Sequence, residues 1–209
     1  MAKLYFRYGA MNSGKTTALI QVAFNYKERG MRVLILKPAI DTKGRDAIIS
    51  RLGVRCTVDA LVFPAMDVFA LVDADAAARG APACVLCDES QFFTPAQAEQ
   101  LFRVTVDLGI PVICYGLRAD FMLRGFPGST RLLELAHTIE EMKTICACGR
   151  KAICNGRKVN GQFVFEGAQV AIDTVDNVEY QSLCPQCWYR EYRAFLARAG
   201  ADGGQAAQP

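Results

Sequence analysis

The sequence predicts an α/β protein in which a mostly parallel β-sheet is covered by helices on both faces. Three observations support this prediction. Apolar runs of strand length recur along the chain, and most of them lack the alternation expected of a sheet with one face in water. Segments with apolar residues at helical spacing separate these runs. A glycine-rich turn follows the first run and leads directly into a helix.

Four apolar runs are expected to form strands: residues 4–8, 32–37, 83–88 and 110–115. The helix after the first run repeats its apolar residues at helical spacing, at Ala18, Leu19, Val22, Ala23 and Tyr26. Gly30 ends this helix. A later helix begins at Thr94, which is an N-cap residue with Pro95 at the first helical position and Gln97 three residues on.

Two parts of the chain interrupt this alternation. Residues 41–50 are charged, contain a glycine and have no strong period, so we expect a loop there. From Thr144 onward, short β-like pieces, turn residues and cysteines indicate a small second domain. We therefore predict a main domain over 1–143, a small second domain over 144–193 and a disordered tail over 194–209.

The turn after the first strand has the pattern G-x-x-x-x-G-K-[ST] of a P-loop, in Gly9, Ala10, Met11, Asn12, Ser13, Gly14, Lys15 and Thr16. Its glycines let backbone N–H groups face phosphate oxygens, and the next helix offers the positive end of its dipole. Lys15 would reach the β and γ phosphates, while the Thr16 hydroxyl would complete a magnesium shell. A glycine-rich turn that binds nothing is the weaker alternative in this strand–turn–helix context.

Two carboxylates, Asp88 and Glu89, end the third predicted strand, where ligands bind in open α/β sheets. Asp88 would hold magnesium, and Glu89 would take a proton from an attacking oxygen. Such a pair alone is often a solvated helix start; the P-loop favours the functional interpretation. Nearby phenylalanines could wall a planar base, although most phenylalanines are core residues: Phe92, Phe93, Phe121 and Phe126.

Two short cysteine pairs predict a structural zinc site: Cys146 with Cys148, and Cys184 with Cys187. Four thiolates would fill every tetrahedral position, and Gly149 eases the turn after the first pair. Four unrelated buried cysteines are the alternative. The remaining cysteines, Cys56, Cys84, Cys87, Cys114 and Cys154, are expected in the core or outside the metal site, and His137 is expected to be a structural residue on a helix.

Composition limits the partners of the 209-residue chain. A net charge of +3 with no basic stripe is too small to indicate a nucleic-acid or membrane partner, and we expect neither. The N-terminus lacks the apolar region of a signal peptide, and no apolar run is long enough for a bilayer. Nine cysteines, an odd number, beside a nucleotide site predict a cytoplasmic protein in which spaced cysteines bind metal.

Five motifs in order resemble the type II thymidine kinase family, most closely its bacterial members, from about residue 2 to 193. They comprise residues 9–16, 88–93, 114–121, 146–152 and Tyr180 with the second cysteine pair. The resemblance implies a RecA-like P-loop domain, a zinc ribbon with a lasso loop over thymidine, and a homotetramer. It further implies transfer of the ATP γ-phosphate to the 5′-hydroxyl of thymidine, which gives dTMP, or of deoxyuridine, with dTTP as feedback inhibitor.

Site roles follow from the same resemblance. Glu89 would be the base, and the phosphates and metal would be met by Asp88, Glu89, Ser90 and Gln91. The nucleoside pocket would be walled by Met11, Phe92, Leu117, Phe121, Phe126 and Tyr180. Two segments depart from the family pattern: Ile172 is followed by Asp173-Thr174 instead of Gly-Gly, and the phosphate-side loop has Asp41-Thr42-Lys43, with Arg45 offset.

Two other functions share parts of this pattern. In a zinc-ribbon ATPase that acts on nucleic acid, Glu89 would activate water; a nucleotide-sensing module would not need Glu89. The compact chain without a basic stripe favours the kinase. We also expect the P-loop to lie on a core separate from the cysteines, so that loss of a zinc ligand would leave ATP binding intact.

Overall fold

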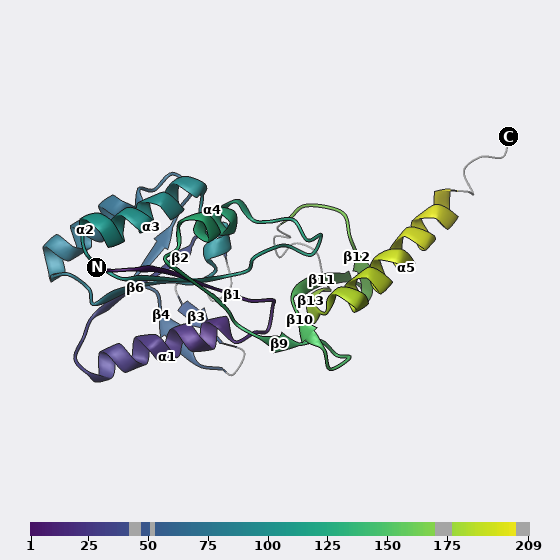
Figure 1. Ribbon diagram of the computed structural model, residues 1–209, viewed down its shortest axis with the longest axis horizontal. Helices are drawn as coiled ribbons and strands as arrows, with labels where there is room; N and C mark the ends of the chain where they lie inside the picture. The colour runs from purple at the N-terminus through teal and green to yellow at the C-terminus, as the bar shows by residue number, and fades with distance from the viewer. Residues whose placement is uncertain (42–46, 51–52, 170–176, 204–209) are drawn as a thin grey trace. The chain divides into compact units, whose positions relative to one another are not determined.

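The computed structural model describes residues 1–41, 47–50, 53–169 and 177–203 (Figure 1). Contacts group the chain into two compact units. The sheet unit comprises Met1–Gly9, Gly14–Arg118 and Gly125–Met142, and the cysteine unit comprises Ala10–Ser13, Ala119–Arg124 and Lys143–Pro209. The boundary between 143 and 144 stays a prediction. Four P-loop residues, Ala10–Ser13, group with the cysteines. The sequence predicted instead that the P-loop would lie on a separate core.

A six-stranded sheet with the order β5-β2-β6-β7-β1-β8 forms the centre of the sheet unit. Its strands are β5 (Ala60–Val62), β2 (Val33–Pro38), β6 (Cys84–Cys87), β7 (Val112–Gly116), β1 (Leu4–Tyr8) and β8 (Thr138–Glu141). Every neighbouring pair is parallel. The α/β prediction is confirmed, and the four predicted strands occupy the four central positions.

Helices cover both faces of this sheet, with α1 on one side and α2 and α3 on the other (Figure 1). Their bounds are α1 (Lys15–Glu28), α2 (Val68–Arg79), α3 (Pro95–Asp107) and α4 (Pro127–Leu135). Leu19 and Ala23 of α1 pack with Cys84, whereas Cys87 packs in the opposite cluster. Strand residues three apart point to opposite faces, so these two cysteines are separate core residues, as predicted.

The start of α3 is the predicted capping box. The Thr94 hydroxyl accepts the Gln97 N–H at 3.1 Å, and the Gln97 side-chain oxygen accepts the Thr94 N–H at 3.0 Å. These two bonds satisfy donors that a helix N-terminus leaves open. The Gln97 side-chain amide also donates to the Phe63 carbonyl at 2.8 Å, which ties the loop before α2 to α3.

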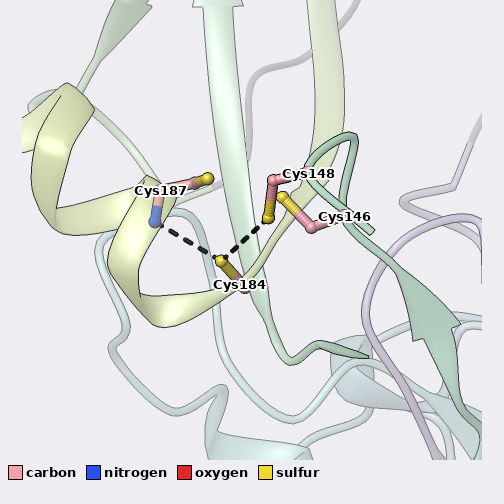
Figure 2. Close-up of side chains that lie close together, drawn as sticks. All are labelled: Cys146, Cys148, Cys184 and Cys187. Atoms are coloured by element: carbon pink, nitrogen blue, oxygen red, sulfur yellow. Dashed lines mark hydrogen bonds between the residues drawn. The ribbon is translucent and has the colours of Figure 1, made fainter. Parts of the chain in front are cut away.

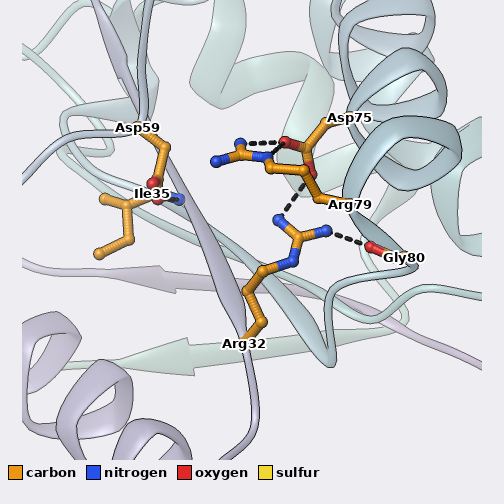
Figure 3. Close-up of polar contacts among 6 residues, drawn as sticks. All are labelled: Arg32, Ile35, Asp59, Asp75, Arg79 and Gly80. Atoms are coloured by element: carbon orange, nitrogen blue, oxygen red, sulfur yellow. Dashed lines mark hydrogen bonds and ion pairs between the residues drawn. The ribbon is translucent and has the colours of Figure 1, made fainter.

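The end of α2 is fixed to the start of β2 by an ion-pair group (Figure 3). Asp75 pairs with Arg32 at 2.7 Å and accepts from the Arg79 Nε at 2.7 Å, and Arg32 also donates to the Gly80 carbonyl. Burial acts to raise the pKa of Asp75, but the hydrogen bonds from Arg79 and Arg32 outweigh burial and hold that pKa below its usual value. Asp75 therefore links two elements as a carboxylate.

Two details of the sheet unit differ from prediction. Ala47–Ile49 form strand β3, which pairs antiparallel with β4 (Arg55–Thr57), because Ala47 and Ile48 are apolar enough to be buried. Residues 42–46 of the predicted loop lie outside the described residues. His137 lies after α4, where its Nδ1 accepts the Leu4 N–H at 3.0 Å, so it is structural, although not helical.

The described residues of the cysteine unit form small antiparallel sheets and helix α5. β9 (Thr144–Ile145) pairs with β10 (Lys151–Ala152), and β11 (Cys154–Val159) lies between β12 (Gln162–Val164) and β13 (Val178–Leu183). Helix α5 spans Pro185–Gly203. The disordered tail predicted from residue 194 is therefore wrong for residues 194–203. One reason is that the Phe195 ring packs against Phe165, at 5.6 Å between centroids; residues 204–209 lie outside the described part.

A membrane-spanning helix is absent from the described residues, since none of their helices combines the length and apolarity that a crossing requires.

Candidate functional site

The P-loop leaves β1 through two left-handed backbone positions. Asn12 has φ 65° and Gly14 has φ 79°. Glycine adopts this conformation freely, and asparagine tolerates it better than most residues, so the sequence suits the turn. The Lys15 side chain is 8% exposed and donates to the Gly9 carbonyl at 3.2 Å. Lys15 is thus folded back over the turn at the N-terminus of α1, where anions are favoured.

Asp88 lies directly after β6 and is buried. Its N–H donates to the Leu36 carbonyl at 3.0 Å, which continues the pairing of β6 with β2. Burial, and next the neighbouring Glu89 carboxylate, raise the pKa of Asp88 to about 8, against the opposing charge of Lys15. A bound cation would favour the charged form of such a group, so Asp88 suits the predicted magnesium role.

Glu89 has a left-handed backbone, with φ 46° and ψ 39°. A long side chain rarely adopts this conformation, and such strained positions concentrate at functional sites. The Glu89 carboxylate accepts from the Gln91 side-chain nitrogen at 2.5 Å. The Gln91 oxygen in turn accepts the Leu117 N–H at 3.0 Å, which fixes the orientation of the amide. Gln91 therefore orients Glu89, a role that the sequence did not reveal.

Close packing holds the turn after Glu89 against β7 and α4. The Ser90 hydroxyl donates to the Tyr115 carbonyl at 2.9 Å. A Cβ on Gly116 would lie 2.7 Å from the Ser90 Oγ, and one on Gly128 would lie 2.3 Å from the Phe93 carbonyl oxygen. Both glycines are required for this approach, and with them the two carboxylates have a rigid support.

The six residues predicted for the nucleoside pocket divide equally between the units. In the sheet unit, the Phe92 and Phe126 rings meet edge to face at 5.7 Å, and Gln91 binds the Leu117 N–H. The cysteine unit contains Met11, Phe121 and Tyr180.

In the cysteine unit, the Arg157 guanidinium lies 3.7 Å from the Phe121 ring centroid. Arg157 also pairs in register with Tyr180 across β11 and β13, and donates to the Glu166 carbonyl at 2.6 Å. Arg157 thus supports two of the predicted pocket residues. Sequence reasoning missed it, because an arginine in a short strand gives no signal of this stacking.

The four predicted metal ligands come together (Figure 2). Their sulfurs point toward one another and all lie within 4.8 Å of each other. The first pair turns tightly, since the Cys146 N–H donates to the Arg150 carbonyl and the Gly149 N–H to the Cys146 carbonyl, both at 2.8 Å. Gly149 has φ 83°, as the predicted turn needs.

The chemistry of these sulfurs fits zinc. Tetrahedral zinc–thiolate geometry requires sulfur pairs about 3.8 Å apart, and the Cys148 and Cys184 sulfurs lie 3.6 Å apart. The Cys187 N–H donates to the Cys184 sulfur and lowers the pKa of Cys184 to about 7, whereas hydrogen bonds with the other three sulfurs raise the pKa of Cys187 to about 12. A thiolate is the metal-binding form of cysteine, so this hydrogen bond favours the ligand state. Cys154 packs in the core beside this group.

Sequence reasoning also missed Lys37 on β2. This lysine is 1% exposed and pairs with Asp41 at 3.0 Å. A lysine at the end of an apolar run is the signal that could have found it, because buried lysines require a partner. Of the departures noted in the sequence, Thr42, Lys43, Arg45 and residues 172–174 lie outside the described residues.

Comparison with known proteins assigns the chain to a family. The family model described as Thymidine kinase matches residues 2–188. The chain belongs to the thymidine kinase family. Proteins named thymidine kinase include one from Ruegeria pomeroyi, 47% identical over 190 residues, which cover 90% of this chain and 94% of that protein. One from Chromobacterium violaceum is 46% identical over 193 residues, covering 91% of this chain and 100% of that protein.

A solved structure of the replication initiator DnaA, bound to AMPPCP and single-stranded DNA, aligns with a TM-score of only 0.39 and 17% identity. The alignment covers 68% of this chain and 41% of that one. The match to the thymidine kinase family, in contrast, includes the P-loop, the Asp88–Glu89 pair and all four clustered cysteines. Every predicted site residue therefore lies within the part of the chain that defines the family.

Proposed function

We propose that this chain transfers the γ-phosphate of ATP to the 5′-hydroxyl of thymidine to give dTMP for nucleotide salvage, and that it phosphorylates deoxyuridine at the same position. The observation that carries the proposal is the oriented Glu89 carboxylate beside buried Asp88, in a chain with a P-loop. An aimed carboxylate next to a metal-binding carboxylate is what phosphoryl transfer to a hydroxyl requires.

Each group has a distinct role in the proposed reaction. Backbone N–H groups within residues 9–16, other than those of Gly9 and Met11, which have protein acceptors, bind the phosphates, and Lys15 places a positive charge on them. Thr16 and Asp88 would hold Mg²⁺, which would offset negative charge on the phosphate oxygens. Glu89 accepts the 5′-hydroxyl proton while that oxygen forms a bond to the γ-phosphorus. The bond from the γ-phosphorus to the bridging oxygen breaks, and ADP leaves with the electron pair.

The nucleoside contacts come from apolar and aromatic side chains. We propose Phe92, Leu117 and Phe126 of the sheet unit, and Met11, Phe121 and Tyr180 of the cysteine unit, as residues that contact the thymidine. Aromatic rings suit the faces of a planar base. By resemblance to the family, backbone amides and carbonyls of the lasso loop would form the hydrogen bonds that select the base.

Zinc, assembly and regulation complete the proposal. The four clustered cysteines hold a structural Zn²⁺ and leave no position open for chemistry. Residues 1–143 act as the kinase domain and 144–193 as the zinc domain. By family resemblance, the protein is a homotetramer and dTTP is its feedback inhibitor. Spaced free cysteines favour a reducing compartment, the cytoplasm.

ATP turnover with and without thymidine tests this function. A thymidine kinase releases ADP only when thymidine is present and forms an equal amount of dTMP. The competing ATPase would release ADP without nucleoside and would be stimulated by single-stranded DNA. Turnover that does not depend on thymidine would contradict the proposal.

A further inference from the structure

Two facing side chains of the cysteine unit hold the peptide groups of Met11 in the P-loop. Asn155 on β11 and Ser182 on β13 are paired in register. The Asn155 Oδ1 accepts the Met11 N–H at 2.8 Å, and the Ser182 hydroxyl donates to the Met11 carbonyl. Asn155 is 4% and Ser182 5% exposed, so both side chains are buried, whereas Met11 is half-buried. We call this pair the Met11 clamp.

The orientation of the Asn155 amide is determined by its other end. Its Nδ2 donates to the Ala119 carbonyl at 2.9 Å, which leaves Oδ1 to accept from Met11. A third contact lies one residue along the loop, where the Thr144 hydroxyl donates to the Asn12 carbonyl at 3.3 Å. The clamp is therefore part of a small network directed at consecutive P-loop residues.

The clamp residues are close in the chain to the metal ligands. Ser182 precedes Cys184 by two residues, Thr144 precedes Cys146 by two, and Asn155 follows Cys154, which packs in the same core as the ligand cysteines. The strands that lead into both cysteine pairs thus also carry the groups that hold the P-loop. Any shift of these strands would move Met11 directly.

The Met11 bonds bear on phosphate binding because of the position of Met11 in the loop. Its N–H is engaged by Asn155, so it serves as an anchor instead of a phosphate ligand. The next residue, Asn12, has the left-handed backbone that turns the loop. A preorganised loop binds anions better than one that must be ordered on binding, because the ordering entropy has already been lost.

We infer that Asn155 and Ser182 are positioning residues for the phosphate loop, through which the cysteine unit sets the affinity for ATP. This inference rests on the proposed binding of ATP by residues 9–16. Neither side chain need touch ATP. Their effect passes through the Met11 backbone, so it depends on the hydrogen-bonding groups and not on the bulk of the side chains.

Equilibrium titration of the full-length protein with a fluorescent ATP analogue, without nucleoside, tests the inference. Ser182→Ala should weaken ATP affinity about three- to tenfold, the effect of one buried hydrogen bond. Ser182→Thr keeps the hydroxyl and should stay within about twofold of wild type. Glu179→Gln, a change at an exposed position of the same strand, is the matched control and should leave affinity unchanged. Melting temperature and zinc content are measured for each variant.

The outcomes separate the possibilities. Weak binding by Ser182→Ala with retained zinc, together with rescue by Ser182→Thr, supports the clamp. Wild-type affinity in Ser182→Ala, or equal loss in both Ser182 variants, overturns it while the proposed function stands. Should Ser182→Ala fold poorly, Asn155→Asp, which keeps the acceptor for Met11, must bind ATP more tightly than Asn155→Ala. A wild-type protein that binds no ATP would overturn both the proposed function and the inference.

Discussion

At the scale of single residues, the carboxylate of Glu89 depends on one amide for its direction. Gln91 donates to Glu89 and accepts from the Leu117 backbone, so its two ends have different and fixed partners. The left-handed backbone of Glu89 adds strain that the surrounding packing must hold. A base and the residue that orients it can be distinguished by kinetics, because only one of them exchanges a proton.

Replacement of Glu89 by glutamine removes the proton acceptor and keeps the shape of the side chain. We expect Glu89→Gln to lower kcat by about 10²–10⁴-fold. ATP affinity should change little, because the P-loop is untouched. Steady-state kinetics with thymidine and a separate ATP titration measure the two effects. A kcat near that of wild type would show that Glu89 is not the base.

Replacement of Gln91 by leucine should give a milder defect of the same kind. The Glu89 carboxylate stays available but loses the donor that orients it, and the Leu117 N–H loses its acceptor. We expect kcat to fall about tenfold or more, in line with the loss of one charge-assisted hydrogen bond. In Glu89→Gln, a further Gln91→Leu change should add little, because the two residues act as a unit. Fully additive losses in the double variant would contradict the orienting role.

At the scale of elements, strands were predicted correctly where burial keeps the run of apolar residues nearly unbroken. The central strands β2, β6 and β7 are buried along their whole length and were found from the sequence together with β1. The short edge strands β5 and β8 are only partly buried and were not found. Helix α3 was found through its cap, whereas α2 begins at an Asp67 cap that no proline or capping box marks. Helix α5 continues past residue 193, where a disordered tail was predicted, and Phe195 there packs against Phe165, a contact between distant residues that the sequence pattern does not show.

The Asp75 ion-pair group predicts a pH-dependent stability that belongs to α2 and β2. The pKa of Asp75 is lower in the folded protein, so its stabilising effect is complete above the unfolded value of about 3.9 and is lost as pH falls through the folded pKa. Asp75→Asn should lower the melting temperature by about 2–4 °C at pH 7. The difference from wild type should shrink as the pH is lowered below 4.

Asp107→Asn provides the control for this measurement. Asp107 also pairs with an arginine four residues away on a helix, but both side chains of that pair are largely exposed. Exposed pairs contribute little to stability, so this variant should melt within about 1 °C of wild type. Equal melting temperatures for wild type and Asp75→Asn at pH 7 would rule out a linking role for Asp75.

At the scale of the whole molecule, sequence position did not predict which residues would group together. The cysteines were correctly paired in a cluster because short spacings of one ligand type are informative. The link from Asn155 to Met11 spans 144 residues and uses a neutral amide and a backbone N–H, a combination with no sequence signature. For the same reason the expectation that the P-loop lies on a core separate from the cysteines is wrong for residues 10–13, which group with the cysteines.

Loss of metal should therefore affect both substrates. Wild-type protein should contain about one zinc per chain, because the four cysteine thiolates complete one tetrahedral site. Cys184→Ser should lose zinc, raise the KM for thymidine and, contrary to the simple two-domain picture, also weaken ATP binding severalfold. Cys56→Ser, outside the cluster, is the control and should keep its zinc. A zinc-free Cys184→Ser variant with wild-type affinity for ATP and thymidine would contradict the expected coupling.

The chain contains one tryptophan, Trp188, which follows Cys187 directly. Its indole stacks on Tyr192 at 5.2 Å, lies edge-on to Phe165 at 5.0 Å and donates to the Phe121 carbonyl at 2.9 Å. Excitation at the red edge of protein absorbance thus reports on the cysteine unit alone. Trp188 is therefore an intrinsic fluorescence probe of the unmodified protein. Its emission would move to longer wavelength if the cysteine unit opened, and the sheet unit, which has no tryptophan, would not contribute to that emission.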